Sequence, residues 1–213
     1  MNNVKTIQLS DLSAMEQRFR ATFINSLGGF KSLALIGTKS KSGQTNLAVF
    51  NSLFHLGANP AMFGLIVRPD SVERHTLTNI RETGFFTVNH VNESIYKKAH
   101  QTSARYPESV SEFDATHLTE LYENNFYAPF VAESNVRIAA QFTGDVPIED
   151  NGTIMVIAKY MSISLPENCI GQDGFVDLNA VGTITCAGLD AYYRTEPIGR
   201  LSYAKPDRLP ENI

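Results

Sequence analysis

The sequence lacks long apolar runs and any excess of positive charge. None of its hydrophobic segments approaches the roughly 18 uninterrupted apolar residues of a transmembrane helix, and residues 1–5 lack the apolar core of a signal peptide. Its 18 Lys and Arg are outnumbered by 22 Asp and Glu, so the formal net charge of -4 leaves no basic footprint for nucleic acid or an anionic membrane. We therefore expect a cytoplasmic protein that binds neither nucleic acid nor membranes.

Cysteine is too scarce for a disulfide scaffold or a structural zinc site. The two cysteines, Cys169 and Cys186, have neither a CxxC partner nor a histidine pair beside them. We expect two buried or neutral thiols. The glycine-rich patterns GxGxxG and GxxxxGK[ST] are also absent, which excludes the usual dinucleotide and triphosphate cradles.

No side chain stands out as a catalytic acid, base or nucleophile. There is no GxSxG motif, and the histidines fall at neither HxxxH nor HxH spacing. These histidines are His55, His75, His90, His100 and His117. Each is interpreted as an ordinary surface or core residue, with a metal-ligand or general-base role as the alternative. If the protein is an enzyme, a cofactor carries the chemistry.

The length and composition predict one domain over residues 1–213. With 213 residues, 43% of them hydrophobic and 10% aromatic, the chain can bury a sizeable core. No internal repeat or low-complexity tract interrupts it. The segment 105–129 is longer than most loops without secondary structure, so we expect it to be functional or to pack against another part of the molecule.

Short apolar runs separated by Gly, Asn and Pro dominate the chain, and a few helical patterns interrupt them. The expected strands are 32–37, 45–56, 61–67, 85–91, 136–143, 153–165, 174–178 and 181–186. The expected helices are 10–27, 70–83, 93–104 and a short one around 117–122. Segment 153–165 is apolar on both faces in places, which predicts a strand buried on both sides. The pattern favours a mainly β fold with inserted helices, a single barrel, over a doubly wound α/β sheet.

Segment 66–77 is the most informative part of the chain. It runs from a strand end through a Pro-Asp turn to a helix start, and it contains two arginines, a histidine and two hydroxyl side chains. A helix start favours an anion and arginine binds phosphate oxygens in a forked geometry, so the segment could hold a phosphate group. The alternative is a solvated turn in which Asp70 and Glu73 cap the helix.

Segment 45–52 is the second candidate. It is a predicted strand that carries Asn, Thr and Ser between apolar residues, and its backbone and amide groups could contact the edge of a flat heterocycle. The small side chain of Ala48 leaves room for such a ring. The alternative is an ordinary strand with one polar face.

Together these segments resemble the flavin reductase-like proteins with an FMN-binding split barrel, often called flavoredoxins. The matching pieces are NLAVFN at 46–51, RPD at 68–70 and RHTLTNIRETGFFTVN at 74–89. Shorter matches follow in register at 102–104, 106–107 and 112–113, and in the tail at 188–194 and 199–206. The resemblance covers nearly the whole chain. Where the family frequently has proline, serine and aspartate, this chain has Val49, Asn51 and His75.

The resemblance implies a six-stranded antiparallel split barrel, used as a homodimer with FMN near the subunit interface. It also implies reduction of flavin by NADH or NADPH, or passage of electrons from reduced FMN to an acceptor. The implied phosphate contacts are Arg68, Ser71, Arg74 and Thr76, with His75 as a possible addition. The implied contacts with the ring edge come from the main-chain and amide groups of Asn46, Leu47 and Ala48, with Asn51 or Ser52 nearby.

Three functions follow from these observations. The first is an FMN-dependent oxidoreductase of the flavin reductase type. The second is an FMN-binding electron carrier, a flavoredoxin, without its own nicotinamide site. The third is a barrel that binds another phosphorylated or acidic small molecule. None of the three requires a metal ion.

Overall fold

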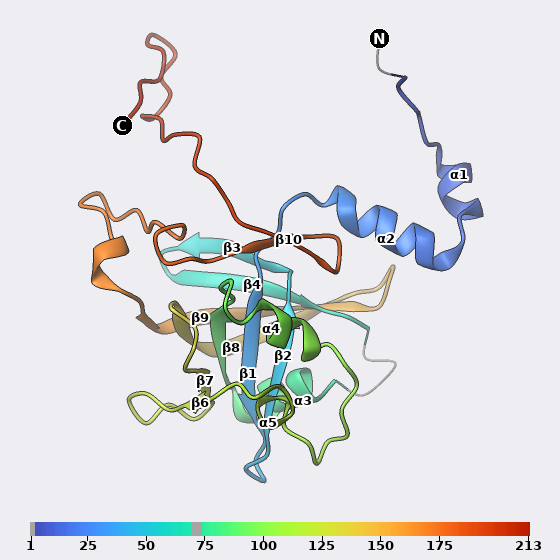
Figure 1. Cartoon of the computed structure of the whole chain (residues 1–213), viewed down its shortest axis with the longest axis vertical. Helices are drawn as coiled ribbons and strands as arrows, with labels where there is room; N and C mark the ends of the chain where they lie inside the picture. Colours follow the sequence, from blue (N-terminus) through green and yellow to red (C-terminus); the bar gives the residue numbers. More distant parts are fainter. Residues whose placement is uncertain (1–2, 70–73) are drawn as a thin grey trace.

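The computed structural model describes residues 3–69 and 74–213, and the regular secondary structure within them is mainly β (Figure 1). A seven-stranded antiparallel sheet has the strand order β2-β1-β5-β8-β9-β4-β3. Its strands are β1 (Ala34–Lys39), β2 (Thr45–Phe50), β3 (Leu53–Ala58), β4 (Ala61–Val67), β5 (Phe85–His90), β8 (Arg137–Ile148) and β9 (Thr153–Ser164). The mainly β fold with inserted helices is therefore confirmed.

The sheet has seven strands and not the expected six, because one of the predicted strands is divided into two. Segment 45–56 breaks at Asn51 and Ser52, where the first half pairs with β1 and the second half with β4. The Ser52 hydroxyl stabilises this break by donating to the carbonyl of Ile66 and accepting from its N–H. Since β2 and β3 are the two edges of the sheet and only two residues join them, the sheet must curl back on itself.

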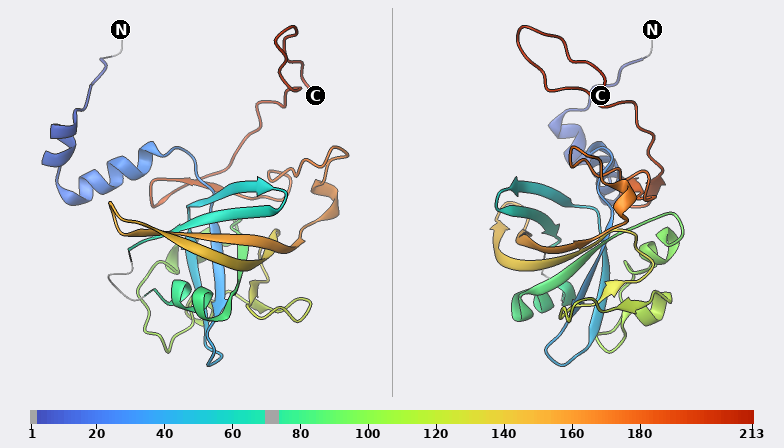
Figure 2. Two further views of the ribbon diagram at one scale, coloured as in Figure 1. Left: turned by 180° about the vertical axis from the view of Figure 1, so that it is seen from behind. Right: turned by 90° about the vertical axis from the view of Figure 1, so that its left-hand side faces the viewer.

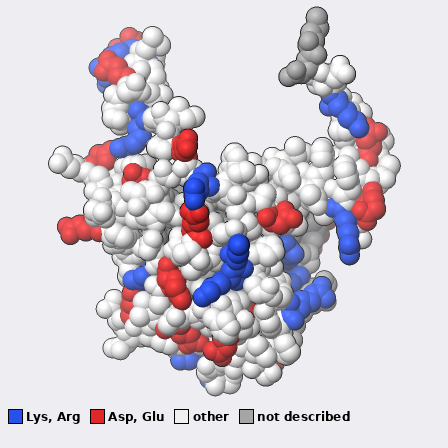
Figure 3. Space-filling model, in the orientation of Figure 1, with Lys and Arg blue, Asp and Glu red and all other residues white. Residues whose placement is uncertain are grey.

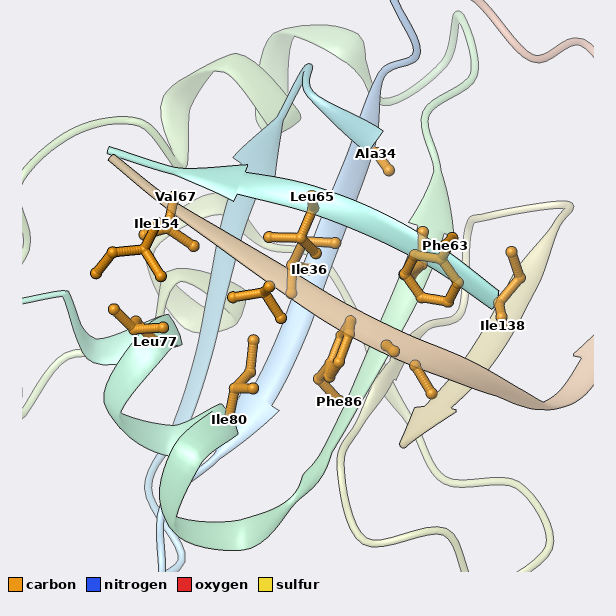
Figure 4. Packing of buried hydrophobic residues seen from close by; sticks show 14 residues of the cluster. Ala34, Ile36, Phe63, Leu65, Val67, Leu77, Ile80, Phe86, Ile138 and Ile154 are labelled. Carbon is orange, nitrogen blue, oxygen red and sulfur yellow. The ribbon is translucent and has the colours of Figure 1, made fainter. Parts of the chain in front are cut away.

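The inside of the curled sheet is the main hydrophobic core (Figure 4). Helix α3 (His75–Thr83) covers it at one end, with Leu77 and Ile80 pointing toward the apolar side chains of the strands. The helix ends at Gly84, whose φ of 77° is the left-handed conformation that glycine adopts without strain. Because Leu77 and Ile80 anchor the helix to the core, the first turn of α3 has a fixed position beside the barrel.

A second apolar cluster lies on the other side of β1 and β2. It is covered by α4 (Tyr96–Gln101), α5 (Glu112–Thr116) and β7 (Phe130–Val131), which pairs with β6 (Glu120–Leu121). The long segment 105–129 therefore packs against the sheet, as expected. At Gly37 an added Cβ would overlap the carbonyl oxygen of Pro129, so this approach requires glycine.

Two of the predicted helices differ from the structure. The opening helix is divided into α1 (Leu9–Ala14) and α2 (Gln17–Leu27), because the carboxylate of Glu16 accepts the N–H of Phe19 and starts a new helix. The short helix expected around 117–122 is instead α5, which ends where His117 adopts a φ of 53°. The expected helix start at 70–73 lies outside the described residues.

Two of the predicted strands also differ. Segment 174–178 forms no strand in the described chain and has only an isolated bridge between Val176 and Ile170, after the short helix η1 (Glu167–Cys169). Segment 181–186 contributes its end to β10 (Thr185–Ala187), which pairs with β11 (Ala191–Tyr193). Strand β9 is not buried on both sides along its length, because Met161 and Ile163 are 54% and 52% exposed.

Both ends of the chain extend from the same side of the barrel (Figures 1 and 2). Helices α1 and α2 bury none of their residues, and the segment after β11 forms a long extended arm. On the face shown in Figure 3, basic and acidic side chains alternate and do not gather by sign. No helix in the described part of the chain is both long enough and apolar enough to cross a membrane.

Candidate functional site

A cavity of about 830 Å³ lies where β2, the end of β4, the start of α3, the segment after α4 and the β10–β11 hairpin meet. This volume is at the upper end of the roughly 300–1,000 Å³ that ligand pockets span. The two candidate segments of the sequence meet in its wall. The structure places these predicted site residues there: Asn46, Ala48, Asn51, Ser52, Arg68, Arg74, His75 and Thr76.

One end of the cavity is cationic. Arg68 follows strand β4 and has an exposed side chain, while Arg74 directly precedes α3 and donates from Nε to the carbonyl oxygen of Pro69 at 3.1 Å. His75 and Thr76 form the first turn of the helix. Because a helix start carries partial positive charge, two arginines beside it create a site that favours an anion.

Strand β2 provides a flatter, less charged wall. Asn46 is buried and donates from Nδ2 to the Thr76 hydroxyl at 2.9 Å, while Ala48 is partly exposed. Asn51 donates to the carbonyl of Gly188 at 3.1 Å and so holds the β10–β11 hairpin over the cavity. The backbone and amide groups of this strand can contact the edge of a ring, and the small side chain of Ala48 leaves room for it.

Two of the predicted residues are not among those that line the cavity in the described part of the chain. Leu47 does not line the cavity, because its side chain is buried in the second apolar cluster. Its N–H donates to the carboxylate of Glu112 at 2.9 Å, so only its carbonyl oxygen is left for a ligand. Ser71 lies outside the described residues.

The far wall contains residues that were not predicted as site residues. His100 and Tyr192 line it and are joined by a 2.7 Å hydrogen bond between Nδ1 and the phenol oxygen. Asn25, from α2, and Cys186 line it as well. The segment 102–108 supplies the remaining side, and parts of it matched the family pattern in register. No local signal in the sequence places His100 beside Tyr192, since 92 positions separate them.

Two ionisable groups of the cavity wall have shifted pKa values. Burial raises the pKa of the Glu112 carboxyl, while the hydrogen bond from Leu47 and the charge of His75 oppose this shift. Burial also raises the pKa of the Cys186 thiol, against the opposing effects of Lys31 and Asn51. Both described cysteines are buried and unpaired, as expected for inert thiols.

The remaining histidines lie apart from the cavity. His55 is exposed on β3 and His117 ends α5. His90, on β5, contacts the Thr183 hydroxyl at 3.3 Å, and burial lowers its pKa to about 4. Among the described residues, no three His, Cys, Asp or Glu side chains are grouped as metal ligands.

Comparison with known proteins links this arrangement to a family. A family model described as "Flavin reductase like domain" matches residues 30–178, which is more than half of the chain. A solved structure of a candidate flavin reductase with a split barrel domain, from Shewanella frigidimarina, is 46% identical in sequence. It superposes with a TM-score of 0.91 over 94% of this chain and 100% of that chain.

More distant structures share the fold. Nitrilotriacetate monooxygenase component B from Bacillus cereus is 21% identical, with a TM-score of 0.80 over 94% of this chain and all of that one. The flavoredoxin of Desulfovibrio vulgaris is also 21% identical, with a TM-score of 0.68 over 84% of this chain and 91% of that one. At this identity the likeness establishes the split-barrel fold alone.

Proposed function

The chain belongs to the flavin reductase like family, and on this premise we propose that it is an FMN-dependent oxidoreductase of the flavin reductase type. The observation that supports the proposal best is the single cavity shared by segments 45–52 and 66–77. It combines a cationic end with a flat wall, as a phosphorylated planar cofactor requires.

The cationic end fits the phosphate of FMN. Arg68 and Arg74 can donate charge-assisted hydrogen bonds to phosphate oxygens, and the first turn of α3 adds backbone N–H groups and partial positive charge. His75 and the hydroxyl of Thr76 lie in the same turn. We assign the phosphate to these four residues and to Ser71.

The wall formed by β2 fits the isoalloxazine ring. Asn46 and Ala48 line it, and Asn51 or Ser52 lies at its end. Because the Leu47 N–H is bonded to Glu112, we assign only the Leu47 carbonyl oxygen a role at the ring edge. The side chains of Asn46 and Asn51 are held by their own hydrogen bonds, so the protein presents a fixed surface.

When bound, FMN would supply the electron-transfer chemistry, with NADH or NADPH as the donor. The side chains of this chain then have to bind the phosphate, orient the ring and leave one side open to a second substrate. None of these tasks requires a side chain to act as an acid or a base.

A direct test uses the purified protein. A yellow preparation with the flavin absorption band near about 450 nm supports FMN binding. Oxidation of NADH or NADPH under air with added FMN then supports the reductase. A colourless protein that does not bind added FMN contradicts the proposal and favours another phosphorylated or acidic ligand.

The alternative is an FMN-binding electron carrier without its own nicotinamide site. The fold shared with the D. vulgaris flavoredoxin favours it as the second candidate. In that case the protein binds FMN but oxidises neither NADH nor NADPH, while chemically reduced FMN on the protein still passes electrons to an acceptor.

We also propose a homodimer. Large apolar side chains on the N-terminal arm are exposed: Phe19 by 60%, Leu27 by 67% and Phe30 by 71%. Met161 and Ile163 on β9 add to this surface. Because a monomer rarely leaves so much apolar area in water, a second copy related by twofold symmetry is the simplest way to cover these side chains.

We propose a cytoplasmic location for the protein. Both described cysteines are free thiols, as is usual for cytoplasmic proteins, and the proposed donors NADH and NADPH are present there.

A further inference from the structure

A buried carboxylate stands directly behind the strand that forms the flat wall of the cavity. Glu112 is 7% exposed, lies at the start of α5 and lines the cavity. Charged side chains are rarely this buried unless a partner compensates them. Here the partner is not an arginine or a lysine but the backbone N–H of Leu47, at 2.9 Å.

This hydrogen bond fixes an otherwise open strand edge. Strand β2 is the last strand of the sheet on its side and pairs only with β1. Its outward N–H groups would be left to water or to a neighbouring chain. The carboxylate of Glu112 accepts a hydrogen bond from the N–H of Leu47. It thereby holds the strand in place at Leu47, between the cavity residues Asn46 and Ala48.

The same carboxylate places negative charge in the cavity wall. The described ion pairs do not include it, and His75 in the first turn of α3 lines the same cavity. A charge in a poorly hydrated wall acts more strongly than one in water. Anionic groups beside a redox cofactor disfavour its electron-rich form.

We propose that Glu112 is a positioning residue of the flavin site, which holds strand β2 against the ring and lowers the reduction potential of the bound flavin. This inference rests on the proposed function, because it assumes that FMN occupies the cavity. It assigns Glu112 two separable effects. The hydrogen bond sets the geometry of the strand, and the charge sets the potential.

Glu120 offers a matched control. Its carboxylate also bonds to β2, because it accepts from the Thr45 hydroxyl at 2.6 Å, but it does not line the cavity. E120Q and E112Q therefore remove the same charge from two carboxylates that hold the same strand. Only E112Q removes it from the cavity wall.

The first measurement is the midpoint potential of the FMN-loaded protein. We expect E112Q to raise the potential so that the equilibrium constant for reduction increases about tenfold, which is about 30 mV for a two-electron couple. E120Q should leave the potential unchanged. Equal shifts in both variants, or no shift in E112Q, would overturn the role of the charge.

The second measurement separates the hydrogen bond from the charge, and it needs no flavin. E112D keeps the charge but is one methylene shorter, so amide hydrogen exchange at Leu47 in the FMN-free protein should be faster than in wild type. Its FMN-loaded form should keep a potential close to that of wild type. A potential in E112D raised to the same extent as in E112Q, or unchanged exchange at Leu47, would contradict the proposal.

These outcomes are distinct from failure of the proposed function. A wild-type protein that binds no FMN overturns that function and this inference together. A wild-type protein that binds FMN, with variants that do not shift the potential, overturns only the inference. If E112Q does not fold, the comparison of E112D with wild type still decides the role of the hydrogen bond, and unchanged exchange at Leu47 overturns it.

Discussion

The side-chain amide of Asn46 donates a 2.9 Å hydrogen bond to the hydroxyl of Thr76, and both residues are buried. Asn46 belongs to strand β2 and Thr76 to the first turn of helix α3, 30 positions later. The bond joins segment 45–52 to segment 66–77. It therefore fixes the flat wall of the cavity relative to its cationic end.

The cationic end should discriminate between flavins by their phosphate. We expect R68A to weaken FMN binding by about 1.5–3 kcal/mol, the scale of a lost charge-assisted hydrogen bond. This corresponds to a loss of roughly tenfold to hundredfold in affinity. Riboflavin, which lacks the phosphate, should lose far less. Titration of both ligands tests this, and equal losses would mean that Arg68 supports the fold instead.

Flavin reduction should not depend on any histidine acting as acid or base. Replacing His55, His75, His90, His100 or His117 singly should lower the reduction rate at saturating cofactor by less than the roughly hundredfold typical of a lost acid or base. H75A is expected to act through FMN affinity, because His75 lies in the first turn of α3. Stopped-flow reduction of FMN-loaded variants by NADH measures this. A greater loss with FMN still bound would contradict the prediction.

The exposed apolar surface predicts an oligomer in solution. Light scattering at micromolar concentration should give a particle of twice the chain mass of 23.6 kDa. Removal of the apolar side chains of the N-terminal arm in a double variant, F19S with L27S, should weaken the assembly because these side chains are 60% and 67% exposed in one copy. A stable particle near 23.6 kDa for the wild type would exclude the dimer.

His90 should make stability depend on pH. Burial lowers its pKa from 6.5 to about 4, so below pH 6.5 the unfolded chain takes up a proton that the folded chain does not. Its contribution to stability is therefore lost as the pH falls from 6.5 toward 4. Between pH 7 and pH 5 we expect a loss of about 1–2 kcal/mol from this residue, allowing for partial exposure.

Urea denaturation at several pH values tests this effect. The variant H90Q should lose less stability than wild type over the same interval, whatever its stability at pH 7. H55Q is the control, because His55 is exposed on β3. An identical pH dependence in wild type and H90Q would refute the assignment.

The docking of segment 105–129 should depend on a glycine in β1. In G37A the added methyl group would overlap the carbonyl oxygen of Pro129 and the hydroxyl of Thr87. We expect a destabilisation of about 1–3 kcal/mol, measured by chemical denaturation, as for other overpacked sites. G144A is the matched control, because no heavy atom lies within 4 Å of its added Cβ. Similar losses in both variants would point to strand propensity and not to overpacking.

The sequence by itself determined the family, the mainly β fold and most strands. These features depend on local order: apolar runs of strand length, turn residues between them, and a helix that ends at Gly84. The phosphate and ring segments also have a fixed order along the chain, which is why their resemblance to the family could be recognised. Both the family and the fold were confirmed.

Only the tertiary structure decided how these segments share one cavity. The break at Asn51 and Ser52 depends on which partner strand each half finds, because β1 and β4 take different halves of one continuous apolar run. The carboxylate of Glu112 reaches the N–H of Leu47 across 65 positions. The alternation of apolar and polar residues indicates which face of a strand is apolar. Contacts between segments far apart in the sequence form only when the sheet curls and brings its edges together.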